Sequence, residues 1–324
     1  MTKSLCLPGI ALLSLLLFLN KETVAQENPL PKEEKGVLVF GGRVRHYLLH
    51  LPPGEIKAPL PLVVALHGLD MSAGEMESLT GLSDLADKEG FAVLYPEGEG
   101  LHQDNGQSWN GGACCGYALD HGIDDVGFVE ALLKKIAGEI PLDASRIYAT
   151  GFSTGAFLTY RLGAELSHIF AAIAPVAGSI GGIHSPQSLP FVIPRPDLPV
   201  AVVAFHGTDD LSIPYDGGPS HGGYSGAMES SYISPMDSAA FFSTRNRCAK
   251  TEEERMSPHV RLEKSTFCEE DADVWLYTLE GGWHAWPGAP GIEQGPPENE
   301  ISASQAIWAF FRAHPKRIFL EENP

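Results

Sequence analysis

Short, unbroken apolar runs recur along this chain and limit its fold more than any other feature. The clearest of them occupies residues 62–66 and ends at His67-Gly68. A strand that is apolar at every position is typical of a parallel sheet, in which both faces of the strand are covered. Similar runs lie at residues 91–94, 147–150, 169–176, 200–205 and 274–279.

Helical patterns separate several of these runs. They lie at residues 79–86, 124–136 and 156–166, with a last one at residues 302–313. Ser302 and Gln305 have the spacing of a capping box at the start of that last helix. Buried strands that alternate with amphipathic helices predict a mostly parallel sheet with helices on both faces, built as one α/β domain over residues 36–314.

Three further segments complete the expected organisation. Residues 37–40 and 43–51 flank Gly41-Gly42 and predict a hairpin. Residues 178–199 and 212–235 are rich in Gly, Ser and Pro and are expected to be long loops. Loops of that length in a compact domain often form binding surfaces or lids.

The first 25 residues have the features of a secretory signal peptide. A positively charged start at Lys3 precedes an apolar run at residues 5–19, and small residues end at Ala25. The apolar run is shorter than the ~20 residues of a membrane span. We therefore expect cleavage after Ala25, a secreted protein, and no membrane span in the mature chain. Residues 26–35 are expected to be a flexible N-terminus and residues 315–324 a C-terminal tail.

Cysteine use and charge restrict the partners. Cys6 would leave with the signal peptide, and the four remaining cysteines would then lie in an oxidising compartment, where disulfides are the default. Cys248 and Cys268 flank a polar segment and are predicted to pair, which leaves Cys114 and Cys115 to pair with each other or to stay reduced. No CxxC spacing occurs, so no metal site is expected. The formal charge of −19 argues against binding to nucleic acid or anionic membranes.

The pentapeptide Gly151-Phe152-Ser153-Thr154-Gly155 is the most informative motif. It follows the strand-like residues 146–150 and precedes a helical pattern, which is the context of a nucleophile elbow. The turn is too tight for side chains two residues before and after Ser153. The backbone N–H of Thr154 would lie at the start of the helix, where it can stabilise an oxyanion.

A serine nucleophile needs a base and an acid that orients the base. Asp209 and Asp210 follow the strand at residues 200–205, and His284 lies in a glycine-bracketed loop after the strand at residues 274–279. The chain order Ser, Asp, His is that of α/β-hydrolases. We expect His284 to be the base and favour Asp210 over Asp209 as the acid, with both aspartates left open.

Several clustered motifs together resemble a known family. They are Leu66-His67-Gly68, Trp109-Asn110, Cys114-Cys115-Gly116, Asp124-Asp125-Val126-Gly127-Phe128, the Ser153 elbow, His206-Gly207-Thr208-x-Asp210 and Gly282-x-His284-x-Trp286-Pro287-Gly288. Over about residues 35–314 the chain resembles the polyhydroxybutyrate depolymerase and feruloyl esterase group of secreted α/β-hydrolases. The resemblance implies Ser153, Asp210 and His284 as the triad. Trp283 replaces a glycine that the family often has.

These residues define the expected function. Ser153 would form an acyl-enzyme with an ester, the N–H groups of Thr154 and Leu69 would bind the oxyanion, and neither a metal nor an organic cofactor is needed. The side chains expected at the substrate are His67, Trp109, Tyr215, Trp283 and Trp286. The expected substrates are feruloyl or acetyl esters of polysaccharide. The alternatives are a polyhydroxybutyrate oligomer depolymerase and a non-catalytic carbohydrate-binding protein on the same fold.

Overall fold

The computed structural model describes residues 1, 33–102, 106–222, 230–291 and 293–317. Internal contacts divide the chain into residues 1–30 and 31–324, and every helix and strand below belongs to the second unit. The expected signal peptide beyond Met1, residues 26–32 and the end of the expected tail lie outside the described residues. Within the described ranges, no helix has the length and apolar character that crossing a membrane requires.

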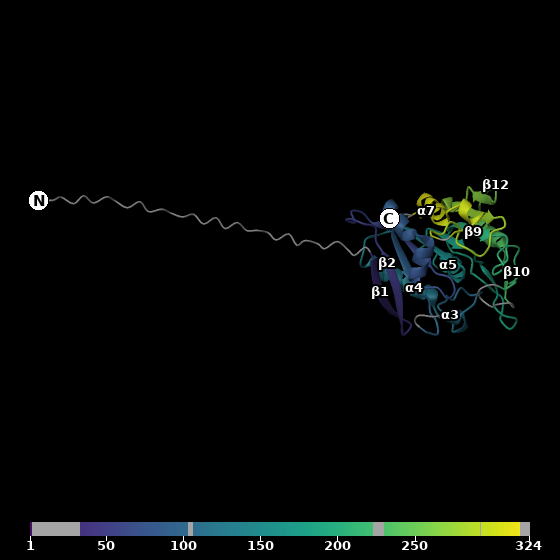
Figure 1. The fold of residues 1–324 in the computed structure, drawn as a ribbon, viewed down its shortest axis with the longest axis horizontal. Coiled ribbons are helices and arrows are strands. Elements are labelled where there is room, and N and C mark those ends of the chain that lie inside the picture. The colour runs from purple at the N-terminus through teal and green to yellow at the C-terminus, as the bar shows by residue number, and fades with distance from the viewer. Residues whose placement is uncertain (2–32, 103–105, 223–229, 292, 318–324) are drawn as a thin grey trace, which may run out of the picture. The chain divides into compact units, whose positions relative to one another are not determined.

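A large mixed sheet forms the centre of the fold (Figure 1). In spatial order, its strands in the described part of the chain are β1 (Glu33–Phe40), β2 (Arg43–His50), β4 (Ala92–Pro96), β3 (Leu60–Leu66), β5 (Leu142–Phe152), β6 (Ala172–Val176), β9 (Ala201–Gly207), β14 (Val274–Leu279), β13 (Val260–Thr266) and β12 (Lys250–Ser257). The strands from β4 to β14 in this order are parallel, and an antiparallel hairpin closes each edge.

Helices cover both faces of this sheet. One face packs against α4 (Asp125–Ala137), α5 (Thr154–Glu165) and α6 (Pro235–Arg245), and the other packs against α1 (Ala73–Thr80), α2 (Leu82–Glu89) and α7 (Ala303–Ala313). In β3, Leu62, Val64 and Leu66 join the first core, whereas Val63 and Ala65 join the second. This two-sided burial explains the unbroken apolar runs and confirms the predicted α/β-hydrolase fold. The short helices are α3 (Tyr117–Asp120) and the 3-10 turns Glu269–Asp271 and Glu298–Glu300.

Some predicted boundaries were wrong. The helix expected at residues 79–86 is two helices, because Gly81 takes a left-handed conformation with φ 59° and ends α1 before α2 begins. Ser72 caps α1 through a capping box with Glu75. Strand β1 begins at Glu33 and not after Lys35, since its first residues pair with β2. Strand β6 begins at Ala172 and not at Ile169.

The edge hairpin β12–β13 was not predicted. Almost every residue of β12 is exposed, so the strand has no apolar alternation that sequence reasoning could detect. Cross-strand ion pairs support it instead: Arg261 contacts Glu253 at 2.6 Å and Lys264 contacts Glu254 at 2.7 Å. Such pairs between neighbouring strands stabilise a sheet.

Where the structure describes them, the two segments expected to be long loops, 178–199 and 212–235, contain four strands of two or three residues. Their strands β7 (Gly181–Ile183), β8 (Phe191–Val192), β10 (Gly218–Pro219) and β11 (Ser231–Tyr232) form a second sheet in the order β10-β11-β7-β8. We call it the small sheet. A Cβ atom at Gly181 would lie 2.3 Å from the carbonyl oxygen of Phe191, so the close pairing of β7 and β8 requires glycine there. Tyr232 and Phe191 of the small sheet pack against Cys114, Cys115 and Phe157.

Candidate active site

Ser153 lies in a sharp turn between β5 and α5. Its φ of 54° and ψ of −118° are unusual for a residue with a side chain, and such strain concentrates at functional sites. A Cβ atom at Gly151 would lie 2.4 Å from the carbonyl oxygen of Gly155, and one at Gly155 would lie 2.3 Å from that of Leu66. Both positions of the motif therefore require glycine, because the turn packs directly against itself and against β3.

Three side chains from distant parts of the chain form a line of hydrogen bonds. His284 Nε2 lies 2.9 Å from Ser153 Oγ, and His284 Nδ1 lies 2.7 Å from Asp210 Oδ2. Ser153 follows β5, Asp210 follows β9 and His284 follows β14, so all three lie at the carboxyl ends of parallel strands. The structure thus brings together the three residues that the sequence singled out.

The environment of Asp210 favours its ionised form. Its Oδ1 accepts hydrogen bonds from the backbone N–H groups of Ser212 and Ile213, both at 2.9 Å. Burial by itself raises the pKa of Asp210, but hydrogen bonds from His206 and His284 outweigh burial and hold the pKa well below its usual value. A carboxylate held in this way can fix the orientation of His284 and stabilise its protonated form.

The neighbouring aspartate is placed differently. Asp209 is exposed and accepts a hydrogen bond from the hydroxyl of Thr208 at 3.2 Å, whereas Asp210 is 2% exposed and faces His284. Between the two residues that the sequence left open, the geometry favours Asp210.

Thr154 and Leu69 are the residues whose backbone N–H groups were expected to bind the oxyanion. Thr154 opens α5, where backbone N–H groups lack partners within the helix, and Leu69 lines the cavity that holds Ser153. His67 was expected at the substrate, but it is fully buried and does not line the cavity that holds Ser153. Its Nδ1 donates to the carbonyl of Gly68 at 2.7 Å, and its Nε2 accepts from the N–H of Gly98 at 2.9 Å. Burial lowers the pKa of His67 to about 4, so the neutral ring holds the backbone at Gly68 and Gly98.

A cavity of about 330 Å³ opens beside Ser153 and His284, and we call it the site cavity. Its volume falls in the range of small-molecule sites. Its polar lining includes Asp70, Glu75 and Ser212. Its apolar lining comes from four separate segments of the chain and consists of Leu69, Met71, Cys114, Cys115, Phe152 and Ile213. Sequence reasoning assigned none of these apolar side chains to substrate binding, and of Leu69 it expected only the backbone N–H, at the oxyanion.

The aromatic residues expected at the substrate do not line the site cavity. Trp109 is 0% exposed and donates its indole N–H to the carbonyl of His67 at 3.0 Å. Trp286 is 1% exposed and donates to the hydroxyl of Ser304 at 3.1 Å. Tyr215 packs against His206, and its hydroxyl bonds that of Thr278 at 2.8 Å.

Trp283 differs from these three residues. It is 61% exposed beside His284, but it is not part of the cavity wall. The presence of aromatic residues near the sequence motifs therefore did not indicate which side chains line the site cavity.

Both pairs of cysteines are joined as disulfides. Cys114 and Cys115 are bonded to each other, with their Cα atoms 3.6 Å apart, and both line the site cavity. Cys248 and Cys268 are bonded across 20 residues, which is the pairing that the sequence favoured. The adjacent cysteines in the sequence were thus the available signal for a cavity wall.

A buried ion pair holds the segment that leads to this wall. Asp125 Oδ1 contacts Arg45 at 2.8 Å, and Asp125 Oδ2 accepts the N–H of Asn110 at 2.8 Å. Burial raises the pKa of Asp125, and the Arg45 guanidinium opposes that shift. Arg45 also lies 3.8 Å from the ring centre of Phe128, so the paired carboxylate, guanidinium and aromatic ring form one packed unit.

We call the segment after β14 that carries His284 the histidine loop. Sequence reasoning missed one polar residue that supports it. Glu298 is buried, and its Oε1 accepts the backbone N–H of Trp283 at 2.9 Å. No motif pointed to it, because it lies in a short 3-10 turn between β14 and α7. Among the residues that the structure describes, no group of three or more His, Cys, Asp or Glu side chains could hold a metal ion.

The sheet, the turn at Ser153 and the three hydrogen-bonded side chains define an α/β-hydrolase fold with a candidate serine-hydrolase site. Comparison with known proteins agrees with the fold. An acetyl xylan esterase from Aspergillus awamori superposes with a TM-score of 0.54, at 13% identity, over 79% of this chain and 94% of that protein. At this identity the likeness shows the fold alone.

Sequence comparison identifies the family. The family model described as "Esterase PHB depolymerase" matches residues 45–221, more than half of the chain. NocK of Nocardia uniformis subsp. tsuyamanensis, whose name describes it as an esterase, is 30% identical over 78% of this chain and 73% of its own length. Feruloyl esterase B of Piromyces equi is 29% identical over 69% of this chain, but only 39% of that protein is covered. The chain belongs to the esterase and PHB depolymerase family.

Proposed function

We propose that the protein is a serine carboxylic-ester hydrolase in which Ser153 is the nucleophile, His284 the base and Asp210 the acid. The observation that carries the proposal is the line of hydrogen bonds from Ser153 Oγ through His284 to Asp210, at 2.9 and 2.7 Å, beside the site cavity. Nucleophile and base lie within the reach that proton transfer needs.

The reaction has two steps. Ser153 Oγ attacks the ester carbonyl and gives its proton to His284 Nε2, while the N–H groups of Thr154 and Leu69 stabilise the oxyanion. The bond to the alcohol then breaks, and the alcohol leaves with the proton from His284. Water, activated by His284, attacks the acyl group on Ser153, which releases the acid and restores the serine hydroxyl. Asp210 holds the imidazole and stabilises its charge in both steps.

The lining of the site cavity supports an acyl group of moderate size. Leu69, Met71, Phe152 and Ile213 offer apolar contacts beside Ser153, with the Cys114–Cys115 disulfide on the same wall. Feruloyl and acetyl groups on polysaccharide are the substrates that we propose. A polyhydroxybutyrate oligomer is the second candidate, favoured by the family description. A non-catalytic carbohydrate-binding role would not require the hydrogen bonds that join Ser153, His284 and Asp210.

Secretion is part of the same proposal. Two disulfides in the described part of the chain fit an oxidising compartment, and residues 1–25 have the pattern of a signal peptide. Sequencing the N-terminus of the exported protein tests this, since a start at Gln26 is expected. A start at Met1 in the exported protein would contradict it.

The activity is tested with purified mature protein and the variant Ser153→Ala. Wild type is expected to hydrolyse a short p-nitrophenyl ester, and the variant to lose on the order of a million-fold in kcat while keeping the far-UV circular dichroism of wild type. Ser145→Ala, at a serine outside the cavity, is the control and keeps full activity. Activity of Ser153→Ala above a few per cent of wild type would remove Ser153 from the mechanism.

Methyl ferulate, an acetylated sugar and amorphous polyhydroxybutyrate then rank the substrates. We expect a higher kcat/KM on one of the first two than on the polymer. Rapid clearing of a polyhydroxybutyrate suspension without release of ferulate or acetate would favour the second candidate and leave the hydrolase assignment in place.

A further inference from the structure

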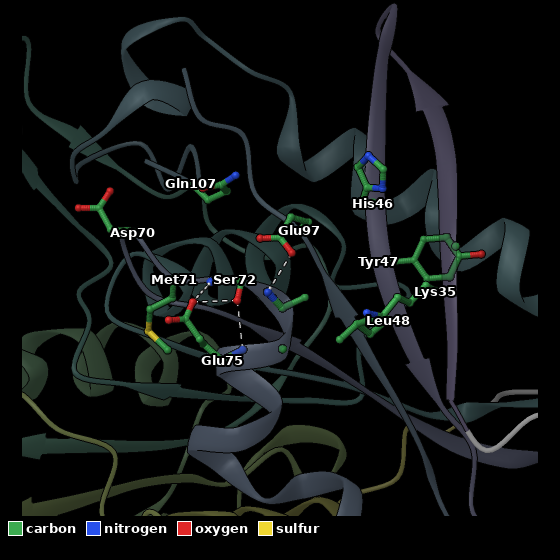
Figure 2. A pocket seen from close by; sticks show the side chains of 13 residues that line it. Lys35, His46, Tyr47, Leu48, Asp70, Met71, Ser72, Glu75, Glu97 and Gln107 are labelled. Carbon is green, nitrogen blue, oxygen red and sulfur yellow. Dashed lines mark hydrogen bonds between the residues drawn. The ribbon is translucent and has the colours of Figure 1, made fainter. Parts of the chain in front are cut away.

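A second and larger cavity of about 580 Å³ meets the site cavity, and Figure 2 shows its walls. Asp70, Met71 and Glu75 line both cavities, so the second one begins where the walls of the first end. It runs from there to the hairpin β1–β2. We call it the polar groove after its hydrogen-bonding side chains, which include Lys35, His46, Asp70, Ser72, Glu75, Glu97 and Gln107.

Three of these side chains are available to a ligand. Lys35 pairs with Leu48 across the hairpin, and His46 lies two residues before Leu48, so Lys35 and His46 project from the same face. Asp70 lies at the opposite end of the groove (Figure 2). With the rest of the described chain, the side chains of Lys35, His46 and Asp70 form no hydrogen bond or ion pair. Donors and an acceptor therefore face the groove with their bonding capacity unused.

The wall at the start of α1 is already ordered. Glu75 Oε2 accepts from the backbone N–H and the hydroxyl of Ser72, at 2.7 and 2.8 Å, and the Ser72 hydroxyl accepts the N–H of Glu75 at 3.2 Å. Figure 2 shows these bonds along the groove. A preorganised polar wall loses little entropy when a ligand binds.

We propose that the polar groove binds the alcohol part of the ester, and that this alcohol is a neutral, hydroxyl-rich chain such as an oligosaccharide. The proposal rests on the proposed function, in which the acyl group occupies the site cavity. Hydroxyl groups both donate and accept, which matches a wall of ammonium, carboxylate, hydroxyl and amide groups. An alkyl alcohol would cover these groups without replacing their bonds to water.

The charge of the polar groove determines whether it favours a neutral or an anionic alcohol. Asp70, Glu75 and Glu97 bring three carboxylates to its lining, against the ammonium of Lys35. A negative wall disfavours an anionic alcohol. The hydroxy acid that leaves a short hydroxyalkanoate oligomer carries a carboxylate, whereas a neutral sugar does not. The groove therefore favours the polysaccharide ester over the hydroxyalkanoate oligomer.

Gly74 provides a direct test. It lines the polar groove but not the site cavity, and a Cβ atom there would meet only Leu48 Cδ1, at 4.0 Å. The Cβ atom of Gly74→Phe therefore fits without displacing the chain, and its ring is expected to enter the groove. Gly295→Phe is the matched control, because Gly295 is exposed, has no atom within 4 Å of its Cβ position and lines neither cavity.

Two esters that share one acyl group but differ in the alcohol distinguish binding in the polar groove from the reaction at Ser153. The acyl group is feruloyl or acetyl, whichever wild type hydrolyses as a simple methyl or ethyl ester, and the second ester carries it on a neutral oligosaccharide. Gly74→Phe is expected to lower kcat/KM on the oligosaccharide ester by about tenfold, the loss of one or two hydrogen bonds, mainly through KM. On the simple ester it stays within about twofold of wild type, as Gly295→Phe does on both esters.

The double variant Lys35→Ala/His46→Ala removes groups instead of filling space, and we expect it to lower kcat/KM on the oligosaccharide ester alone. Equal losses on both esters, or no loss on the oligosaccharide ester in either variant, would overturn the groove proposal. A wild-type protein that hydrolyses neither ester would instead overturn the proposed function.

Discussion

Trp283 and Glu298 are joined by a hydrogen bond from the backbone N–H of Trp283 to Glu298 Oε1, at 2.9 Å. Because Trp283 directly precedes His284, this buried carboxylate sets the position of the histidine loop without touching Ser153. The backbone N–H of Gly288 also donates to the carbonyl oxygen of Glu298, at 2.8 Å, so Glu298 holds the loop on both sides of His284.

Replacing Glu298 tests whether it positions the histidine. Glu298→Ala removes the acceptor, and we expect kcat to fall about 10- to 100-fold with little change in KM, because a small displacement of His284 misaligns proton transfer. Glu298→Gln keeps an oxygen acceptor and is expected to recover most of the activity. Glu300→Ala is the control, since Glu300 binds Ser257 and His259 away from the site. Equal losses of kcat in Glu298→Ala and Glu300→Ala would argue against positioning.

The two adjacent aspartates give a matched pair of variants. Asp210→Asn is expected to lower kcat by roughly 10⁴, because an amide leaves His284 in the wrong tautomer and cannot stabilise its charge. Asp209→Asn removes an exposed carboxylate whose side-chain hydrogen bond within the described residues is to Thr208, so kcat should stay within a fewfold of wild type. Steady-state kinetics on a p-nitrophenyl ester decides this. A larger loss at Asp209 would show that the wrong aspartate was chosen.

His67 makes folding stability depend on pH in a defined direction. Its pKa is about 4 in the folded chain and about 6.5 when unfolded, so between these values the unfolded state binds the proton first. The contribution of neutral His67 to the free energy of unfolding is complete above the unfolded pKa. As pH falls toward 4, the free energy of unfolding drops by about 3 kcal/mol.

Denaturant unfolding at pH 7.5, 5.5 and 4 measures this effect. His67→Gln is expected to show a flatter fall in the free energy of unfolding than wild type, and His46→Gln, at an exposed histidine, should follow wild type. Identical pH dependence in wild type and His67→Gln would be incompatible with a neutral, buried His67.

The two disulfides should contribute differently. Cys248→Ala/Cys268→Ala opens a 20-residue loop and is expected to lower the free energy of unfolding by about 3 kcal/mol, with ester hydrolysis unchanged at 25 °C. Cys114→Ala/Cys115→Ala opens no loop but changes the wall of the site cavity, so it should alter kcat/KM more than stability. Denaturant unfolding and kinetics of both double variants test this, and the opposite pattern would contradict it.

The parallel centre of the fold could be predicted because its strands contain short apolar runs whose side chains are buried on both faces of the sheet. The edge hairpin could not, because ion pairs such as Arg261–Glu253 support an exposed strand. The small sheet was missed because its strands are two or three residues long and their partners are distant in sequence.

The candidate site also contains residues that could be predicted from the sequence and residues that could not. Ser153, Asp210 and His284 could be predicted because each follows a recognisable strand of the parallel centre. The cavity walls could not, since nothing local in the sequence distinguishes buried Trp109 from exposed Trp283. Ile213 and Cys114 reach the cavity only through the folding of separate loops around it.

The candidate catalytic side chains and the outer walls of the two cavities come from different parts of the fold. The candidate catalytic side chains follow strands of the buried parallel centre, whereas the small sheet packs behind the Cys114–Cys115 wall and the hairpin β1–β2 borders the groove. Neither the small sheet nor the hairpin β1–β2 contributes a residue to the turn at Ser153. Redesign of these outer parts is therefore expected to change which ester is bound while the candidate catalytic side chains keep their places.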